Sequence, residues 1–73
     1  MAPRRDTRAL RRLGETVRKF REERGLSQEA VAFEAGIHVN HLSSIERGAA
    51  NPSFLVLLAL TRVLGKKLSI PAE

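Results

Sequence analysis

Short and mostly uncharged side chains cluster between Gly36 and Gly48, interleaved with larger apolar residues at helical spacing. The short side chains are those of Val39, Asn40, His41, Ser43 and Ser44. Leu42 and Ile45 lie three residues apart, so in a helix they share one face and leave the short side chains on the other. Amide and hydroxyl groups can hydrogen-bond to base edges, and a valine can contact a thymine methyl. The segment is therefore typical of a helix that enters the major groove of DNA.

Catalytic and metal chemistry find little support in the same region. His38 and His41 are one helical turn apart and could share a metal, but neither a thiol nor a free carboxylate completes the site. Ser43 and Ser44 lack the neighbouring base and orienting acid that a nucleophile requires. The chain also has no cysteine and no glycine-rich phosphate loop. The sequence therefore predicts no enzyme, no metal and no cofactor.

A second short helix is predicted directly before this one. Ser27 is a suitable N-cap, and the helix should stop at Gly36, because glycine adopts the left-handed conformation at low cost. Two helices that cross through a tight turn need close backbone approach, which Ala32 and Gly36 permit. Residues 27–47 therefore read as a helix-turn-helix.

Two further helices should support this pair. Asp6 or Thr7 can cap a first helix that ends at Arg24 and Gly25, although Gly14 costs about 1 kcal/mol relative to alanine and is expected to loosen it. Its apolar face is formed by Leu10, Leu13, Val17 and Phe20. Asn51 or Ser53 can cap a fourth helix over residues 54–64.

Charge is unevenly distributed along the 73 residues, which suffice for one domain. The net charge is +5, and residues 1–24 hold nine of the thirteen basic residues but four of the eight acids. Clustered arginine favours a polyanionic partner, most simply DNA. No apolar run is long enough for a membrane span or resembles a signal peptide, so we expect a cytoplasmic, nucleoid-associated protein.

The helix-turn-helix resembles that of the phage-repressor and Cro-like family, also called the XRE family. The matching residues are Gln28, Ala32, Gly36, Ile37, Leu42, Ile45, Glu46, Arg47 and Gly48. The similarity covers about residues 13–70 and implies an all-α fold of four to five helices, like that of lambda repressor, with a truncated last helix. The domain would span residues 6–73, after a basic arm at residues 1–5.

The resemblance also implies roles for individual residues. Val39, Asn40 and Ser44 match positions that reach base edges, and Ser43 lies beside them. Gln28 and Arg47 match positions that contact phosphates, to which we add His38, His41, Asn51, Arg4 and Arg5. Arg21 and Glu46 match an ion pair that ties the first helix to the third.

Two positions depart from the family pattern. His38 stands where serine or threonine usually caps the third helix, so we expect the start of that helix to be loosely fixed. Phe33 stands where a polar residue is usual, and we expect it to pack partly buried, since a single ring is too little for binding single strands.

The fourth helix is apolar on nearly all sides. Its family core positions are filled by Phe54, Leu57, Leu58, Leu60 and Leu64. A second apolar face is formed by Leu55, Val56, Ala59 and Val63. A chain of this size has no second layer to cover that face, so a homodimer is predicted.

Together these features predict a transcriptional regulator that binds double-stranded DNA sequence-specifically, as a homodimer on a palindromic operator. A controller protein of a restriction-modification system, or a phage-type repressor, fits the compact form best. The alternative is an antitoxin-like protein that binds a toxin partner as well as its own operator. An RNA-binding or purely structural bundle ranks third.

Overall fold

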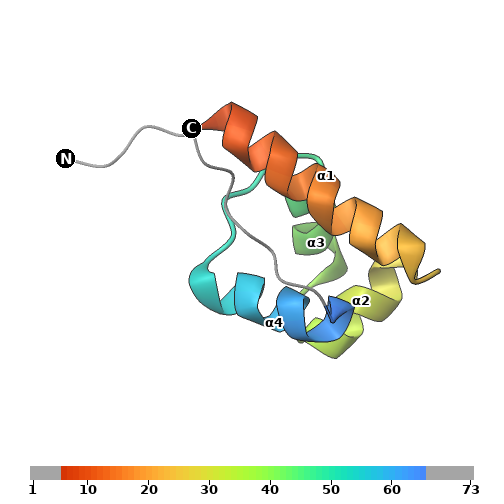
Figure 1. The fold of residues 1–73 in the computed structure, drawn as a ribbon. Helices are drawn as coiled ribbons and strands as arrows, with labels where there is room; N and C mark the ends of the chain where they lie inside the picture. The colour runs from red at the N-terminus through yellow and green to blue at the C-terminus, as the bar shows by residue number, and fades with distance from the viewer. Residues whose placement is uncertain (1–5, 66–73) are drawn as a thin grey trace.

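The computed structural model describes residues 6–65, which form four helices joined by short loops (Figure 1). The helices are α1 (Thr7–Glu23), α2 (Gln28–Ala35), α3 (Val39–Glu46) and α4 (Phe54–Leu64). The described part contains no strand, so the all-α prediction is confirmed. The predicted basic arm at residues 1–5 and the truncated last helix lie outside the described residues.

Each of the four helices in residues 6–65 begins at a side chain that accepts a hydrogen bond from a backbone amide of the first turn. Asp6, Ser27 and Ser53 cap α1, α2 and α4 through oxygen atoms. At α3 the Nδ1 atom of His38 accepts a hydrogen bond from the amide of Asn40 at 3.1 Å. The expectation of a loosely fixed α3 was therefore wrong, because an imidazole nitrogen takes the place of the usual hydroxyl oxygen.

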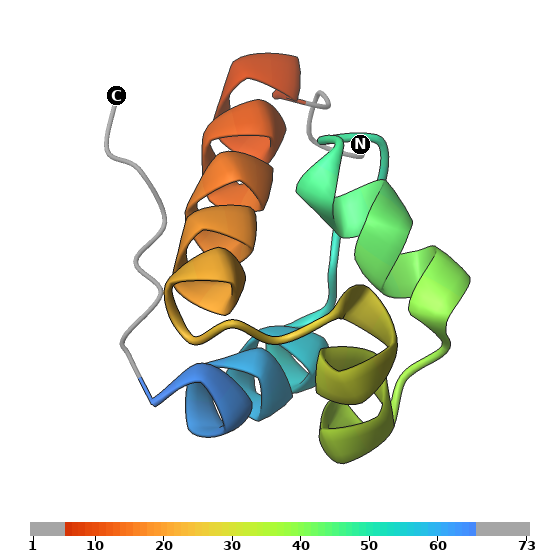
Figure 2. The same cartoon turned by 90° about the vertical axis from the view of Figure 1, so that its right-hand side faces the viewer.

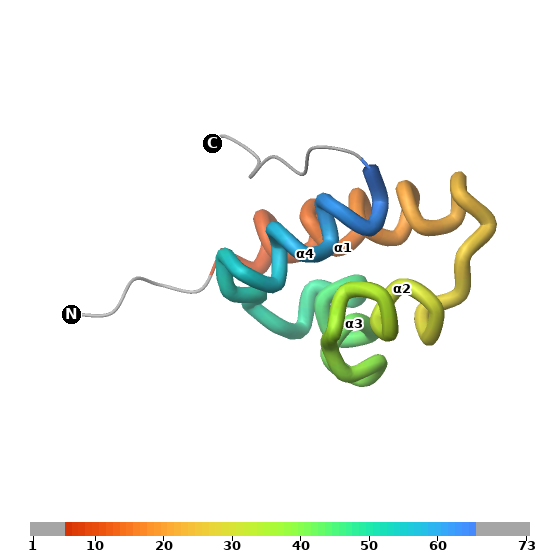
Figure 3. Tube along the Cα trace, turned by 90° about the horizontal axis from the view of Figure 1, so that it is seen from below, coloured from red at the N-terminus to blue at the C-terminus, as the bar shows by residue number. Residues whose placement is uncertain are grey.

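The α2–α3 pair turns sharply at Gly36, whose φ angle is +73°. Figure 2 shows α3 beside α1, with α2 and α4 at their lower ends. Seen from below in Figure 3, α2 and α3 form a turn-linked pair on one side of the molecule. Glycine favours this left-handed conformation. A Cβ atom at Gly36 would meet nothing within 4 Å, so the expectation that this glycine permits close backbone approach was wrong, and it is the backbone conformation of the turn that favours glycine.

All four helices contribute to one small core. Its fully buried large side chains are those of Val17, Val31, Leu42, Ile45, Leu60 and Leu64. Two aromatic residues lie outside it, contrary to expectation: Phe54 is 74% exposed and Phe33 is 87% exposed. Phe54 is the first residue of α4, and the buried part of that helix lies further along, at Leu60 and Leu64.

Gly14 corrects another expectation. Instead of loosening α1, it lies inside a continuous helix and is buried. A Cβ atom there would lie 2.6 Å from the carbonyl oxygen of Glu46, and closer still to that of Ile45. The absence of a side chain therefore lets α1 rest directly on the C-terminal end of α3. Within residues 6–65, no helix has the length and apolar character needed to cross a bilayer.

Candidate nucleic-acid interface

The outward face of α3 carries the predicted base-contacting residues. Asn40 is exposed near the start of the helix, and Ser43 and Ser44 are half-buried one turn later. Arg47 follows after one more turn and is exposed. Positions three and four apart lie on one face of a helix, so these side chains form a polar row along α3.

Val39 is a predicted base-contacting residue that also packs against the core. It was predicted to reach a base, yet it packs partly buried against the hydrophobic core. Its neighbour Asn40 points away from that core and is exposed. Of these two predicted base-contacting residues, only Asn40 is free of packing constraints.

Arg47 folds back onto the end of α3. Its Nε donates to the carbonyl oxygen of Ser43 at 3.3 Å, and its Nη2 donates to Oγ of Ser44 at 3.2 Å. A cation at a helix C-terminus is favoured by the helix dipole. The predicted phosphate contact at Arg47 and the predicted base contact at Ser44 are therefore joined by a hydrogen bond.

Glu46 connects α1, α2 and α3. Its Oε2 accepts from Nε of Arg21 at 2.7 Å, and its Oε1 accepts from Nη2 of Arg21 at 3.0 Å. The predicted ion pair is thus present, with side chains only 12% exposed for Arg21 and 3% exposed for Glu46. The hydrogen bonds to Glu46 raise the pKa of Arg21 above its ordinary value, although burial acts in the opposite direction. The third donor of Arg21, Nη1, reaches the carbonyl oxygen of Leu26 at 2.8 Å.

Gln28 belongs to the same network, which sequence reasoning missed. Its Nε2 donates to Oε1 of Glu46 at 3.0 Å. The side chain predicted to contact phosphate therefore faces Glu46 and ties the first residue of α2 to α3. The sequence offered no signal for this bond, since residues 28 and 46 are far apart along the chain.

The other predicted backbone contacts lie around the row. His38 is exposed and caps α3, while His41 is half-buried on the same helix. Asn51 is exposed in the loop between α3 and α4. Arg4 and Arg5 lie outside the described residues. No group of three metal-ligating side chains occurs within residues 6–65.

The residues predicted to form a dimer interface differ in exposure. Leu55 is 72% exposed, directly after the exposed Phe54. Ala59 is half-buried, whereas Val56 and Val63 pack partly buried against the core of their own chain. The accessible apolar surface of α4 is therefore concentrated at its first turn.

Comparisons with known proteins agree with this geometry. A family model described as "Helix-turn-helix" matches residues 17–70. The chain is 40% identical over 53 residues to the uncharacterized HTH-type transcriptional regulator y4dJ of Sinorhizobium fredii, covering 73% of this chain and 69% of that protein. It is 38% identical over 53 residues to the control protein C.BamHI of Bacillus amyloliquefaciens, covering 71% of this chain and 65% of that protein.

A solved structure shares the fold. The crystal structure of the restriction-modification controller protein C.AhdI from Aeromonas hydrophila aligns with a TM-score of 0.77 and 34% sequence identity, covering 80% of this chain and 88% of that one. The family resemblance predicted from the sequence is thus confirmed. With its matched residues extending over most of its length, this chain belongs to the helix-turn-helix family of DNA-binding transcriptional regulators.

Proposed function

We propose that the chain binds a palindromic operator as a homodimer and that α3 reads the bases of each half-site. The observation that carries this proposal is the polar row on α3, with Asn40 exposed and the helix held against α1 by the Arg21–Glu46 pair and by the close approach at Gly14. A fixed helix with short polar side chains fits the major groove, where an asparagine can make paired hydrogen bonds to adenine.

The apolar first turn of α4 supports the dimer. Phe54 and Leu55 are adjacent and largely exposed, which is unfavourable in water unless another surface covers them. The simplest surface that could bury these two side chains is the same face of a second copy of the chain. A two-fold dimer would present two copies of α3 to half-sites about one helical turn of DNA apart, which is why we propose a palindromic operator.

Similarity to control proteins favours one subtype. C.BamHI and C.AhdI are described as control or controller proteins, the latter of restriction-modification. We therefore propose a controller role rather than a phage-type repressor or the antitoxin-like alternative. A regulator of this kind would act in the cytoplasm, on the nucleoid.

Asn40→Ala tests the reading role of α3, and Asn51→Ala is its matched control. The operator is first selected from random duplex DNA with the wild-type protein, and affinities are then measured on the selected and on random duplexes. Asn40→Ala should cost about 1–3 kcal/mol on the selected duplex and almost nothing on the random one. Asn51→Ala removes the same amide from the α3–α4 loop, so it should weaken both duplexes by a similar factor, as a phosphate contact does.

Two outcomes would contradict the proposal. Failure of the wild type to enrich any sequence would refute sequence-specific binding. Equal losses for Asn40→Ala on both duplexes would mean that α3 contacts the backbone and that another element reads the bases.

A further inference from the structure

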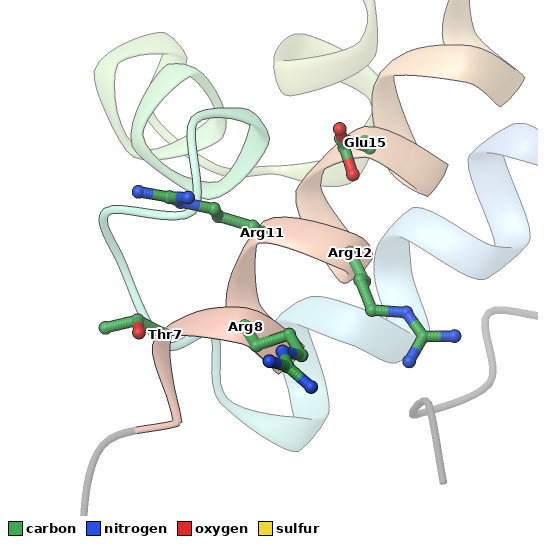
Figure 4. Close-up of a pocket in the computed structure, with 5 residues that line it drawn as sticks. All are labelled: Thr7, Arg8, Arg11, Arg12 and Glu15. Atoms are coloured by element: carbon green, nitrogen blue, oxygen red, sulfur yellow. The ribbon is translucent and has the colours of Figure 1, made fainter. Parts of the chain in front are cut away.

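Arginines crowd the first two turns of α1. Arg8, Arg11 and Arg12 are all exposed and line an open hollow of about 450 Å³ together with Thr7 and Glu15 (Figure 4). The arginines do not point the same way. Figure 4 shows Arg11 extending toward the loop between α3 and α4, whereas Arg8 and Arg12 point away from that loop.

Arg11 lies directly on the loop that follows α3. A Cβ atom added to Gly48 would be 2.9 Å from both Cα and Cγ of Arg11, so the stem of the arginine rests on the glycine. Gly48 immediately follows Arg47, the last member of the polar row on α3. The stem of Arg11 therefore lies beside the C-terminal end of α3, and its guanidinium extends toward the α3–α4 loop (Figure 4).

The charge of Arg11 is uncompensated within residues 6–65. Arg18 pairs with Glu22, Arg21 pairs with Glu46, and Arg24 donates to the carbonyl oxygen of Leu64 at 3.1 Å. No acidic side chain of the described residues pairs with Arg11, including Glu15, which lines the same hollow. The arginines at positions 18, 21 and 24 thus contact other groups of the fold, whereas Arg11 has donors available for a ligand.

The loop beneath Arg11 offers donors of the same kind. In residues 6–65, the backbone amides of Ala50 and Asn51 donate no hydrogen bond to the rest of the backbone, and the side chain of Asn51 is exposed. Backbone amides, an asparagine side chain and a guanidinium are the groups with which proteins hold DNA phosphates. These donors belong to the loop toward which Arg11 extends (Figure 4).

We propose that Arg11 binds a backbone phosphate of DNA next to the bases that α3 reads, so that the interface continues from the end of α3 onto α1. This inference rests on the proposed function, because it places the phosphate relative to a helix in the major groove. A guanidinium can hold two phosphate oxygens at once, which fixes the position of the protein on the duplex as well as adding affinity.

The test compares Arg11→Gln with Arg12→Gln on the full chain. Both residues are exposed on α1 and both changes remove one positive charge, so any long-range electrostatic effect is matched. Affinity for the selected duplex is measured from about 50 to 200 mM salt. Each lost phosphate contact flattens the slope of log affinity against log salt by about 0.9, and a dimer that loses two contacts flattens it by about 1.8. The ratio of wild-type affinity to Arg11→Gln affinity should therefore shrink about twelvefold over that range.

Arg12→Gln should keep the wild-type slope, and Arg11→Lys should restore the slope because it keeps the charge. Equal slopes for Arg11→Gln and Arg12→Gln would overturn the inference while leaving the proposed function intact, since the wild type would still prefer its selected duplex. A wild type without any preference for a selected duplex would refute the proposed function and the inference with it. Melting temperatures of both glutamine variants should match that of the wild type, which separates binding from folding.

Discussion

Replacing Glu46 with glutamine should be among the most damaging single-atom changes in the chain. The side chain keeps its shape but loses its charge, which leaves the guanidinium of Arg21, only 12% exposed, without its counterion. Removing one partner of a buried pair costs about 3–5 kcal/mol. A domain of this size has a total stability near the low end of about 5–15 kcal/mol, so the loss takes away a large fraction of it. At about 4–8 °C per kcal/mol, this loss of about 3–5 kcal/mol should lower the melting temperature by about 12–40 °C.

The chain supplies a matched control for this substitution. Arg18 and Glu22 form an ion pair at 3.2 Å on the surface of α1, with side chains 63% and 56% exposed. Exposed pairs at this spacing contribute about 0.3–0.5 kcal/mol, so Glu22→Gln should shift the melting temperature by only a few degrees. Thermal unfolding followed by far-ultraviolet circular dichroism, without DNA, measures both variants.

A double mutant separates the pair from the rest of the network. Arg21→Met alone should also destabilise, because it leaves the carboxylate of Glu46 with Gln28 as its only remaining donor in the network. The double variant Arg21→Met, Glu46→Gln contains neither buried charge and should recover about 1–3 kcal/mol relative to the summed single losses. Strictly additive losses, or a Glu46→Gln variant as stable as Glu22→Gln, would refute the reasoning.

The pH dependence of this contribution has a definite sign. Folding raises the pKa of Arg21. The stability linked to its proton is therefore fully present below the pKa that Arg21 has in the unfolded chain, and it is lost only as pH rises through the higher pKa that Arg21 has in the folded chain. Titration of Arg21 should therefore leave the melting temperature unchanged around neutral pH. A loss of stability near neutral pH in the wild type that disappears in Arg21→Met would contradict this assignment.

Three other substitutions test separate features of the structure. Gly14→Ala should lower the free energy of unfolding by about 1–3 kcal/mol despite its better helix propensity, because the added methyl meets the carbonyl oxygens at the end of α3; a more stable variant would contradict the observed close approach. His38→Ala should cost about 0.5–2 kcal/mol while His38→Ser restores the cap, and a His38→Ala variant as stable as the wild type would show that the imidazole contributes nothing. Leu55→Glu should shift the sedimentation mass of the protein from dimer toward monomer, and a wild type that stays monomeric at micromolar concentration would refute the proposed dimer.

Local sequence signals predicted the helices well, because their ends depend on the immediate neighbours. Ser27 caps α2 and Gly36 closes it in a left-handed conformation, both of which follow from single-residue preferences. Spacing of the apolar residues likewise placed Val17, Leu42 and Ile45 in the core. These features need no knowledge of how distant segments meet.

Features that depend on distant segments were less predictable. Gly14 read as a weak point of α1, because propensity describes an isolated helix and not the neighbouring α3 that rests on it. Phe54 was assigned to the core because it matches a core position of the family, but it is the first residue of α4 and lies ahead of the part of the helix that packs inward. The bond between Gln28 and Glu46 joins residues 18 positions apart and becomes visible only when both helices are placed.

The position of Val39 has a consequence for how this chain could acquire new target sequences. Because its side chain packs against the core, a large or charged replacement would disturb folding together with the proposed base contact. The side chain of Asn40 is exposed and does not pack against the core, so it could be exchanged with little effect on stability. Divergence of target preference, in nature or in a randomised library, should therefore proceed mostly through residue 40, with residue 39 confined to small apolar side chains.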